Sequence, residues 1–188
     1  MAYQVMWYKT SLPKDVVDIF LKEEKDFKRN LEKGLVSGDD NPNISIRNSD
    51  CSWISSKHWM AGLCYHYILK ANEENFRYDI GSFGNREIQY TSYTEGQYYK
   101  WHVDTSLAIQ EEDTDKVRKL SFSLQLSDPE EYSGGELQLL SDDNFSYFAP
   151  KTKGSIIIFD SRMRHRVRKV NSGCRKSLVG WVEGPVWR

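Results

Sequence analysis

The sequence has few cysteines, no surplus of either charge and no long apolar run. Its cysteines, Cys51, Cys64 and Cys174, are odd in number and widely spaced, and they form no Cys-x-x-Cys pair. This pattern predicts neither a disulfide framework nor a zinc knuckle, and it favours a reducing, cytoplasmic setting with inert thiols. The formal net charge of -1 argues against a general polyanion binder.

The absence of long apolar runs bears on membranes. No stretch is long enough to cross a bilayer, and the first residues lack the basic and apolar regions of an export signal, so we expect no membrane association. The 188 residues, of which 39% are hydrophobic and 28% charged, fit one globular domain. The aromatic content of 13% favours a β-rich core.

The periodicity of the sequence changes near residue 87. Before it, the spacing of apolar residues predicts a helix from an N-cap at Ser11 to about Leu31, and a second helix over residues 57–72. After it, short stretches alternate with period two between turns, most clearly over residues 120–126. Many short strands at this spacing predict a sandwich or barrel.

These patterns together predict one β-rich (α+β) domain over residues 1–188. A helical flank with supporting strands takes up residues 1–86, and the β-rich core takes up residues 87–188. Within the core, the polar and acidic segment 105–118 is predicted to be a loop. It is either a lid over a substrate or a solvated connector.

A His-x-Asp sequence ends one predicted strand. On a strand, His102 and Asp104 would point to the same face, and an imidazole beside a carboxylate suits a transition metal. His58 and His66 lie on the predicted second helix, where a structural role is the simpler interpretation. His165 follows an apolar strand and could return to the same site. Two histidines and one carboxylate form the facial triad of non-haem Fe(II) oxygenases.

Arg175 lies shortly after His165 in the sequence. A hairpin that pairs the strand of His165 with the strand beginning near Arg175 would bring the guanidinium to the metal side, where it could clamp a carboxylate. Ser177 would share its face and could add a hydrogen bond to the same ligand. The competing interpretation of Arg175 is a solvated hairpin arginine.

Several short motifs follow one another in order along the C-terminal half. They are Gln89-Tyr90-x-x-Tyr93-x-x-Gly96-Gln97-x-Tyr99-x-x-His102-x-Asp104, Gly134-Gly135-Glu136-Leu137, Gly154-Ser155, His165-Arg166-Val167, and Gly173-x-Arg175-x-Ser177 with Gly180-Trp181. In this order they resemble the prolyl 4-hydroxylase-like branch of the Fe(II)/2-oxoglutarate dioxygenases. The N-terminal half matches only in style, with a helix, an Arg-x-Ser-like strand and a second helix.

The resemblance implies a double-stranded β-helix, which is a jelly-roll-like barrel, flanked by N-terminal helices. It implies that His102, Asp104 and His165 bind Fe(II). It also implies that Arg175 pairs with the distal carboxylate of the cosubstrate 2-oxoglutarate, with support from the hydroxyl of Tyr93.

Two positions refine the resemblance. Tyr99 stands where the family often has an aromatic residue, and packing is its expected role. Arg175 stands where the collagen-type enzymes usually carry lysine, whereas bacterial and oxygen-sensing relatives carry arginine. Collagen is therefore a less favoured target.

The activity implied by the resemblance is hydroxylation of a C–H bond with Fe(II), 2-oxoglutarate and O₂, releasing succinate and CO₂, and it admits ascorbate as a further cofactor. The favoured substrate is a prolyl residue in a peptide or protein. The alternatives are a small molecule, a nucleic-acid base, which is less favoured, and a non-catalytic jelly-roll binding module. Because Asp104 is a carboxylate, hydroxylation is favoured over halogenation.

Basic and aromatic residues leave the choice of substrate open. The oligomeric state is not indicated by the sequence. A basic run surrounds His165, and alternation would place its arginines on the face opposite that histidine, either as a solvated surface or as a groove for an acidic peptide or phosphate backbone. Tryptophans could line a substrate groove or pack in the core. The basic run consists of Arg162, Arg164, Arg166, Arg168 and Lys169. The tryptophans are Trp53, Trp59, Trp101 and Trp187.

Overall fold

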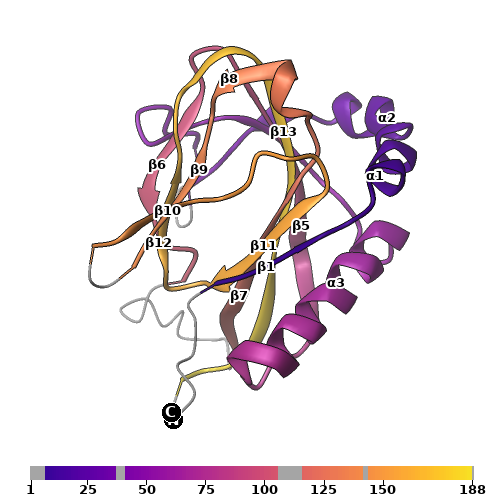
Figure 1. Ribbon diagram of the computed structural model, residues 1–188, viewed down its shortest axis with the longest axis vertical. Coiled ribbons are helices and arrows are strands. Elements are labelled where there is room, and N and C mark those ends of the chain that lie inside the picture. Colours follow the sequence, from indigo (N-terminus) through magenta and orange to yellow (C-terminus); the bar gives the residue numbers. More distant parts are fainter. Residues whose placement is uncertain (1–6, 37–40, 106–115, 142–143, 188) are drawn as a thin grey trace.

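The computed structural model of the chain describes residues 7–36, 41–105, 116–141 and 144–187, apart from the side chains of residues 84–87. Its strands form two antiparallel sheets that face each other (Figure 1). The larger sheet holds β1 (Trp7–Ser11), β2 (Glu32–Lys33), β4 (Asp50–Trp53), β5 (Phe83–Thr94), β7 (Lys116–Gln125), β8 (Tyr132–Gly134), β11 (Ser155–Asp160) and β13 (Val170–Pro185). The smaller sheet holds β3 (Arg47–Asn48), β6 (Tyr98–His102), β9 (Leu137–Leu140), β10 (Ser146–Phe148) and β12 (Arg164–Val167).

The strand order crosses the sequence order several times, as expected for a jelly roll. The larger sheet runs β1-β11-β7-β13-β5-β4-β2, with β8 paired to one end of β13, and the smaller sheet runs β10-β9-β12-β6-β3. The predicted β-rich α+β fold with a double-stranded β-helix is confirmed. That the chain forms a single domain over residues 1–188 stays a prediction.

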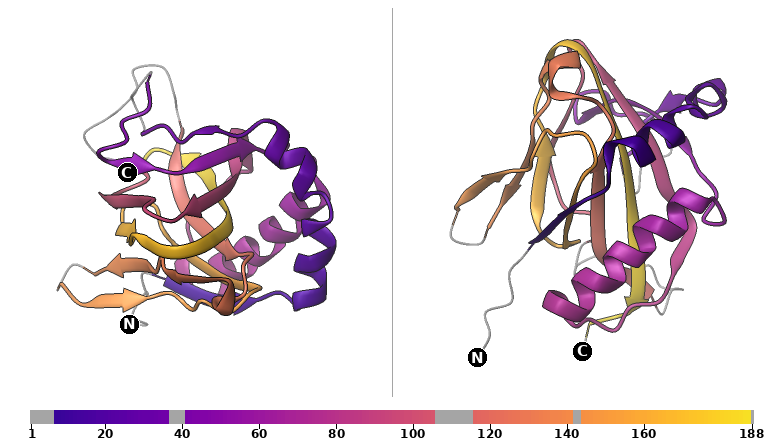
Figure 2. Two further views of the ribbon diagram at one scale, coloured as in Figure 1. Left: turned by 90° about the horizontal axis from the view of Figure 1, so that it is seen from above. Right: turned by 45° about the vertical axis from the view of Figure 1, so that its right-hand side comes forward.

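Helices cover the outer face of the larger sheet, on the side away from the smaller sheet (Figure 2). They are α1 (Lys14–Leu21), α2 (Glu24–Arg29) and α3 (Trp59–Ala71), and two short turns complete the helical content, the π-helical η1 (Asn72–Phe76) and the 3-10 η2 (Pro129–Glu131). None of the helices in the described part of the chain is long and apolar enough to cross a bilayer.

The core consists of two apolar layers, one on each side of the larger sheet. Phe20, Ile68 and Leu124 belong to the layer between the helices and this sheet. Leu139 and Phe159 belong to the layer between the two sheets. Burying one such side chain contributes about 1.5–3 kcal/mol.

The alternation predicted for residues 120–126 is present in β7, but both faces of this strand are buried. Leu120 and Leu124 pack in the helical layer. Ser121, Ser123 and Gln125 face the interior between the sheets, and at most 7% of each is exposed. The smaller sheet covers the polar face of β7, so this face lines the interior rather than meeting solvent.

The first predicted helix differs from the structure at both ends. Ser11 is not an N-cap, because it ends β1 and pairs with Ser155 of β11, and Pro13 takes the N-cap position of α1. The helix also stops at Leu21, and α2 follows as a separate segment. The pairing of β1 with β11 is a tertiary contact that a local helix signal does not reveal.

The predicted hairpin between the strand of His165 and the strand of Arg175 is wrong. Strand β12 pairs with β6 and β9 in the smaller sheet, whereas β13 crosses to the larger sheet and pairs with β5, β7 and β8. The two strands therefore face each other across the barrel. Arg175 approaches the interior from the opposite sheet.

The basic run is split between a turn and a strand. Arg164 is exposed on β12, and Arg166 stacks on Trp101 with its guanidinium 4.6 Å from the ring centroid. Arg162 does not share this strand face, because it lies in the turn before β12 and pairs with Asp160. Alternation therefore places only part of the run on one face.

Asp160 ties the end of β11 to neighbouring segments. Its fully buried carboxylate accepts hydrogen bonds from the Tyr78 hydroxyl at 2.6 Å and from Nε of Arg162 at 2.9 Å. Burial by itself would raise the pKa of Asp160, but the hydrogen bonds from Arg162 and Tyr78 outweigh it and hold the pKa below its usual value. Folding therefore favours the ionised form.

We expect Asp160→Asn to lower the free energy of unfolding by about 2 kcal/mol at neutral pH, because it removes the buried carboxylate that pairs with Arg162, whose side chain is 35% exposed. Since the folded-state pKa is depressed, this contribution is present above the unfolded-state pKa and is lost as the pH falls through the folded-state pKa. Urea denaturation at several pH values measures both effects. Asp26→Asn, which removes an exposed ion pair with Arg29 on α2, is the control and should have little effect. An equal loss in both variants would contradict the assignment.

Candidate active site

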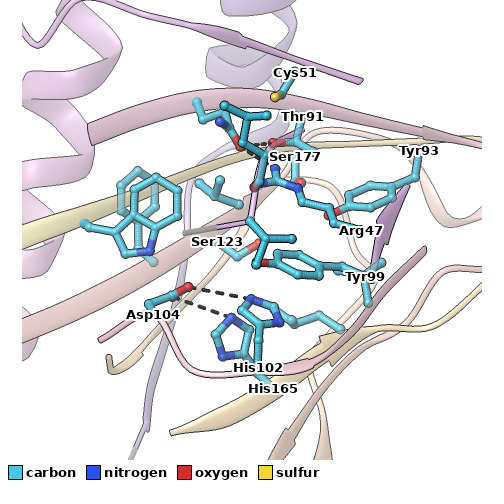
Figure 3. Close-up of a pocket in the computed structure, with 18 of the residues that line it drawn as sticks. Arg47, Cys51, Thr91, Tyr93, Tyr99, His102, Asp104, Ser123, His165 and Ser177 are labelled. Atoms are coloured by element: carbon cyan, nitrogen blue, oxygen red, sulfur yellow. Dashed lines mark hydrogen bonds and ion pairs between the residues drawn. The ribbon is translucent and has the colours of Figure 1, made fainter. Parts of the chain in front are cut away.

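A cavity of about 310 Å³ lies between the two sheets. Its lining includes His102, Asp104 and His165 at one side and Thr91 and Ser177 at the other (Figure 3). The volume falls in the range of small-molecule binding sites. Both sheets contribute to the lining, so the cavity depends on how the sheets pack together.

The structure brings the three predicted metal ligands together. His102 of β6 and His165 of β12 stand directly opposite each other in the pairing of these strands. Nε2 of His102 lies 3.6 Å from Oδ1 of Asp104, and Nε2 of His165 lies 3.5 Å from Oδ2 of Asp104 (Figure 3). The candidate ligand atoms of all three residues lie within 4.8 Å of one another.

Backbone contacts orient both imidazoles. Nδ1 of His102 donates to the carbonyl oxygen of Lys100 at 2.8 Å, and Nδ1 of His165 donates to that of Met163 at 2.9 Å. These bonds occupy Nδ1 of each ring and leave Nε2, which faces Asp104, as the atom available to a metal. This is the arrangement in which a second hydrogen bond sets the tautomer of a metal-binding histidine.

The electrostatics of the cluster suit a divalent cation. Burial, followed by the neighbouring His165, lowers the pKa of His102 to about 3, so this imidazole is neutral at neutral pH. Burial alone would raise the pKa of Asp104, but the two histidines and a 2.6 Å hydrogen bond from Ser121 keep it below its usual value. Two imidazole nitrogens and an ionised carboxylate are the donor set that Fe(II) takes in non-haem oxygenases, so these residues fit the ion.

A β-bulge, rather than simple alternation, positions His102. The pairing of β6 with β12 shifts between His165 and Val167, so that two residues of β6 oppose one of β12. Tyr99 and His102 consequently both face the cavity, and their rings stack with centroids 3.5 Å apart. The packing role expected for Tyr99 matches this contact.

Asp104 reaches the site from beyond the end of its strand. Strand β6 ends at His102, and the backbone N–H of Asp104 donates to the carbonyl oxygen of Ser161 at 2.9 Å. The expectation that both ligands share one strand face is therefore wrong in its geometry, although the two residues do meet. A turn anchored to the segment before β12 carries the carboxylate into place.

The predicted cosubstrate residues also come together, on the larger sheet. Arg175 of β13 stands opposite Tyr93 of β5 in the strand pairing, and its guanidinium lies 5.7 Å from the Tyr93 ring centroid. Nη1 of Arg175 donates to Oγ of Ser177 at 3.2 Å. At most 3% of any of the three residues is exposed. A buried cation beside hydroxyl groups can hold a carboxylate.

Sequence reasoning missed two residues of the site. Ser121, which holds Asp104, belongs to the polar positions of β7, and its alternation with leucines was the available signal. Arg47 of β3 lines the cavity and is 7% exposed. It appeared in the sequence only as part of an Arg-x-Ser-like strand, and no local pattern indicates that this strand joins β6.

Comparison with known proteins identifies the family. The profile of the 2OG-Fe(II) oxygenase superfamily matches residues 88–183. The chain therefore belongs to this superfamily, whose members use Fe(II), 2-oxoglutarate and O₂.

Curated relatives place the chain near the prolyl hydroxylase-like branch, as the motifs predicted. A PKHD-type hydroxylase of Psychrobacter sp. is 35% identical over 98 residues, which cover 52% of this chain and 38% of the relative. A PKHD-type hydroxylase of Cupriavidus metallidurans is 28% identical over 134 residues, covering 69% and 58%. The chain thus spans about half the length of the curated relatives it matches.

Solved structures share the fold. A Pseudomonas putida prolyl-4-hydroxylase has a TM-score of 0.74 and 22% identity, covering 94% of this chain and 91% of its own. The viral collagen prolyl hydroxylase from Paramecium bursaria Chlorella virus-1, in complex with 2-oxoglutarate, has a TM-score of 0.69 and 19% identity, covering 96% and 97%. At these identities the likeness establishes the double-stranded β-helix alone.

We expect His165→Ala to weaken Mn(II) binding by about 100-fold or more, because it removes one of the three side chains that would hold the metal. Isothermal titration calorimetry of the full chain measures this loss. His66→Ala, at an exposed position on α3, is the matched control and should bind Mn(II) as the parent does. Unchanged affinity in His165→Ala would place the metal elsewhere.

We also expect Arg175→Gln to weaken 2-oxoglutarate binding on the order of 10- to 100-fold, because a hydrogen bond to a charged group is lost. Titration of the Mn(II)-loaded protein with 2-oxoglutarate gives the Kd. Arg175→Lys keeps the charge and should recover part of the affinity. If the glutamine variant binds as tightly as the parent, the distal carboxylate lies at another residue.

Proposed function

We propose that the chain is an Fe(II)- and 2-oxoglutarate-dependent oxygenase that hydroxylates a C–H bond, most favourably in a prolyl residue of a peptide or protein, with release of succinate and CO₂. The observation that carries this proposal is the convergence of His102, Asp104 and His165 in a cavity that also contains the buried Arg175. The reaction requires that Fe(II) and 2-oxoglutarate bind side by side, and one cavity here offers metal donors and an anchor for a carboxylate.

In the proposed mechanism His102, Asp104 and His165 hold Fe(II), which when bound supplies the activation of O₂ coupled to decarboxylation of the cosubstrate. The guanidinium of Arg175 binds the distal carboxylate of 2-oxoglutarate, and Tyr93 and Ser177 surround that end. Two imidazoles held by backbone carbonyl groups and a carboxylate fixed by Ser121 keep the donor set preorganised. The buried walls of the cavity exclude water from the reacting groups.

The mouth of the cavity supports a peptide substrate. Leu35, Trp53 and Val103 line the cavity and are between 37% and 46% exposed, so they form an apolar rim. Trp53 also lies 6.5 Å from Trp181, measured between ring centroids. Of the tryptophans considered for a substrate groove, Trp53 is the one that lines this cavity. Apolar and aromatic side chains at a cavity mouth suit the compact apolar ring of a prolyl residue.

Relatives add support for the same class of substrate. A prolyl hydroxylase from Trichoplax adhaerens, whose structure contains a peptide fragment of hypoxia inducible factor, shares the fold with a TM-score of 0.75 at 15% identity. That protein binds a peptide. The loop expected over residues 105–118, either a lid or a solvated connector, lies outside the described residues at 106–115, and its end is strand instead of loop because β7 begins at Lys116. The cytoplasmic setting stays a prediction.

We expect the purified chain to convert 2-oxoglutarate to succinate when Fe(II) and O₂ are supplied, and His165→Ala to lose this activity. Mass spectrometry of a library of proline-containing peptides should then reveal a gain of one oxygen, and no chlorinated product when chloride is present. Oligonucleotides carrying methylated bases form a second arm, in which formaldehyde release would favour a nucleic-acid substrate. Absence of succinate from a metal-loaded, folded chain would leave only the non-catalytic binding module.

A further inference from the structure

A second arginine, Arg47, extends into the same cavity. It is 7% exposed, and Figure 3 shows it on the opposite side of Tyr99 from His102. Its guanidinium carbon lies 4.9 Å from the Tyr99 ring centroid. Tyr99 in turn stacks on His102, so a group bound to Arg47 would lie near the metal ligands.

Among the described residues, the hydrogen-bond partners of Arg47 are all neutral. Nε donates to Oγ of Ser49 at 2.9 Å, Nη1 donates to the carbonyl oxygen of Leu35 at 2.9 Å, and Nη2 donates to Oε1 of Gln89 at 2.6 Å. A guanidinium has five N–H donors, so one N–H remains on each terminal nitrogen. Two N–H groups on neighbouring nitrogens match the two oxygens of a carboxylate.

None of the nearby carboxylates whose positions the structure describes neutralises Arg47. Asp50 is held by Lys33 at 2.6 Å, and Asp104 lies between the histidines. Glu32 lines the cavity but is exposed. Within the described ranges of the chain, Arg47 forms no ion pair. Burying a charge without an ionised partner is unfavourable in free energy. An anionic ligand bound to Arg47 would remove this penalty.

Arg47 and Arg175 approach the cavity from different sheets. Arg47 comes from β3 in the smaller sheet, whereas Arg175 comes from β13 in the larger sheet. Tyr93 lies near both: burial raises the pKa of Tyr93, and the two guanidinium groups oppose this rise. Gln89, which holds Arg47, pairs with Val179, and Ser177 and Arg175 lie progressively further along β13. Two buried guanidinium groups in one cavity can therefore hold two different carboxylates.

We propose that Arg47 binds a carboxylate of the primary substrate, so that the substrate is an acid: a peptide with a side-chain or C-terminal carboxylate close to the hydroxylated carbon, or a free amino or imino acid. This inference rests on the proposed function, because it assigns Arg175 to 2-oxoglutarate. The planar guanidinium of Arg47 matches a carboxylate, and the cavity, which also has to hold the cosubstrate, is small. Both features favour a carboxylate over a larger phosphate group.

The test is an NMR titration of the full chain containing labelled arginine, diamagnetic Zn(II) and saturating 2-oxoglutarate. Acetate is the probe, and acetamide is its neutral match in size. The Arg47 resonance, assigned by its loss in Arg47→Lys, should shift saturably with acetate, with a Kd on the order of millimolar, and should not respond to acetamide. An unmoved resonance, or an equal response to both probes, would overturn the inference.

Two variants separate this site from the cosubstrate site. Arg47→Gln should lose the acetate response while its affinity for 2-oxoglutarate stays close to that of the parent, and Arg175→Gln should show the reverse. If Arg47→Gln weakens 2-oxoglutarate as much as Arg175→Gln does, Arg47 serves the cosubstrate and the inference is wrong. If neither variant affects 2-oxoglutarate, the proposed function fails whatever acetate does. The titration of the parent chain decides the question even if Arg47→Gln does not fold.

Discussion

The register between β6 and β12 is the constraint on which the site depends. It sets His102 directly opposite His165 and, through the bulge beside them, turns Tyr99 into the same cavity. A slip by one residue would turn one imidazole out of the cavity, because side chains alternate between the faces of a strand. The backbone hydrogen bond from Asp104 to Ser161 then holds the Asp104 carboxylate beside the two imidazoles. One strand pairing thus assembles donors that lie far apart in the sequence.

The two sheets contribute different chemistry to the cavity. The smaller sheet carries the two imidazoles and Arg47, and the larger sheet carries Arg175 and the hydroxyl groups around it. Strand β7 shows how the larger sheet serves both the core and the site. Its leucines pack against the helices, while Ser121 on its other face fixes Asp104. Covering one face of the sheet with helices therefore leaves the polar face free to line the cavity.

Buried charge links the site to stability. Asp104, Arg175 and Arg47 are charged groups at a largely buried site, and their hydrogen bonds go mainly to neutral partners. Such groups oppose folding when they lack counter-charges. The metal and carboxylate ligands that we propose for this site would supply those counter-charges, and their binding free energy would add to the stability of the folded state. Buried groups with perturbed ionisation are common at functional sites.

The sequence by itself determined the class of fold, the strand character of β7 and the candidate metal and cosubstrate residues, but not Ser121 or Arg47. These follow from local signals: period-two alternation, and the ordered motifs around His102, His165 and Arg175. Only the tertiary structure decided that β12 joins β6 instead of β13, that Asp104 lies beyond its strand, and that Arg47 enters the cavity. Strand partners and register are set by packing between segments distant in the chain, and no local pattern encodes them. Ser11 shows the same limit, because its pairing with β11 overrides a local helix signal.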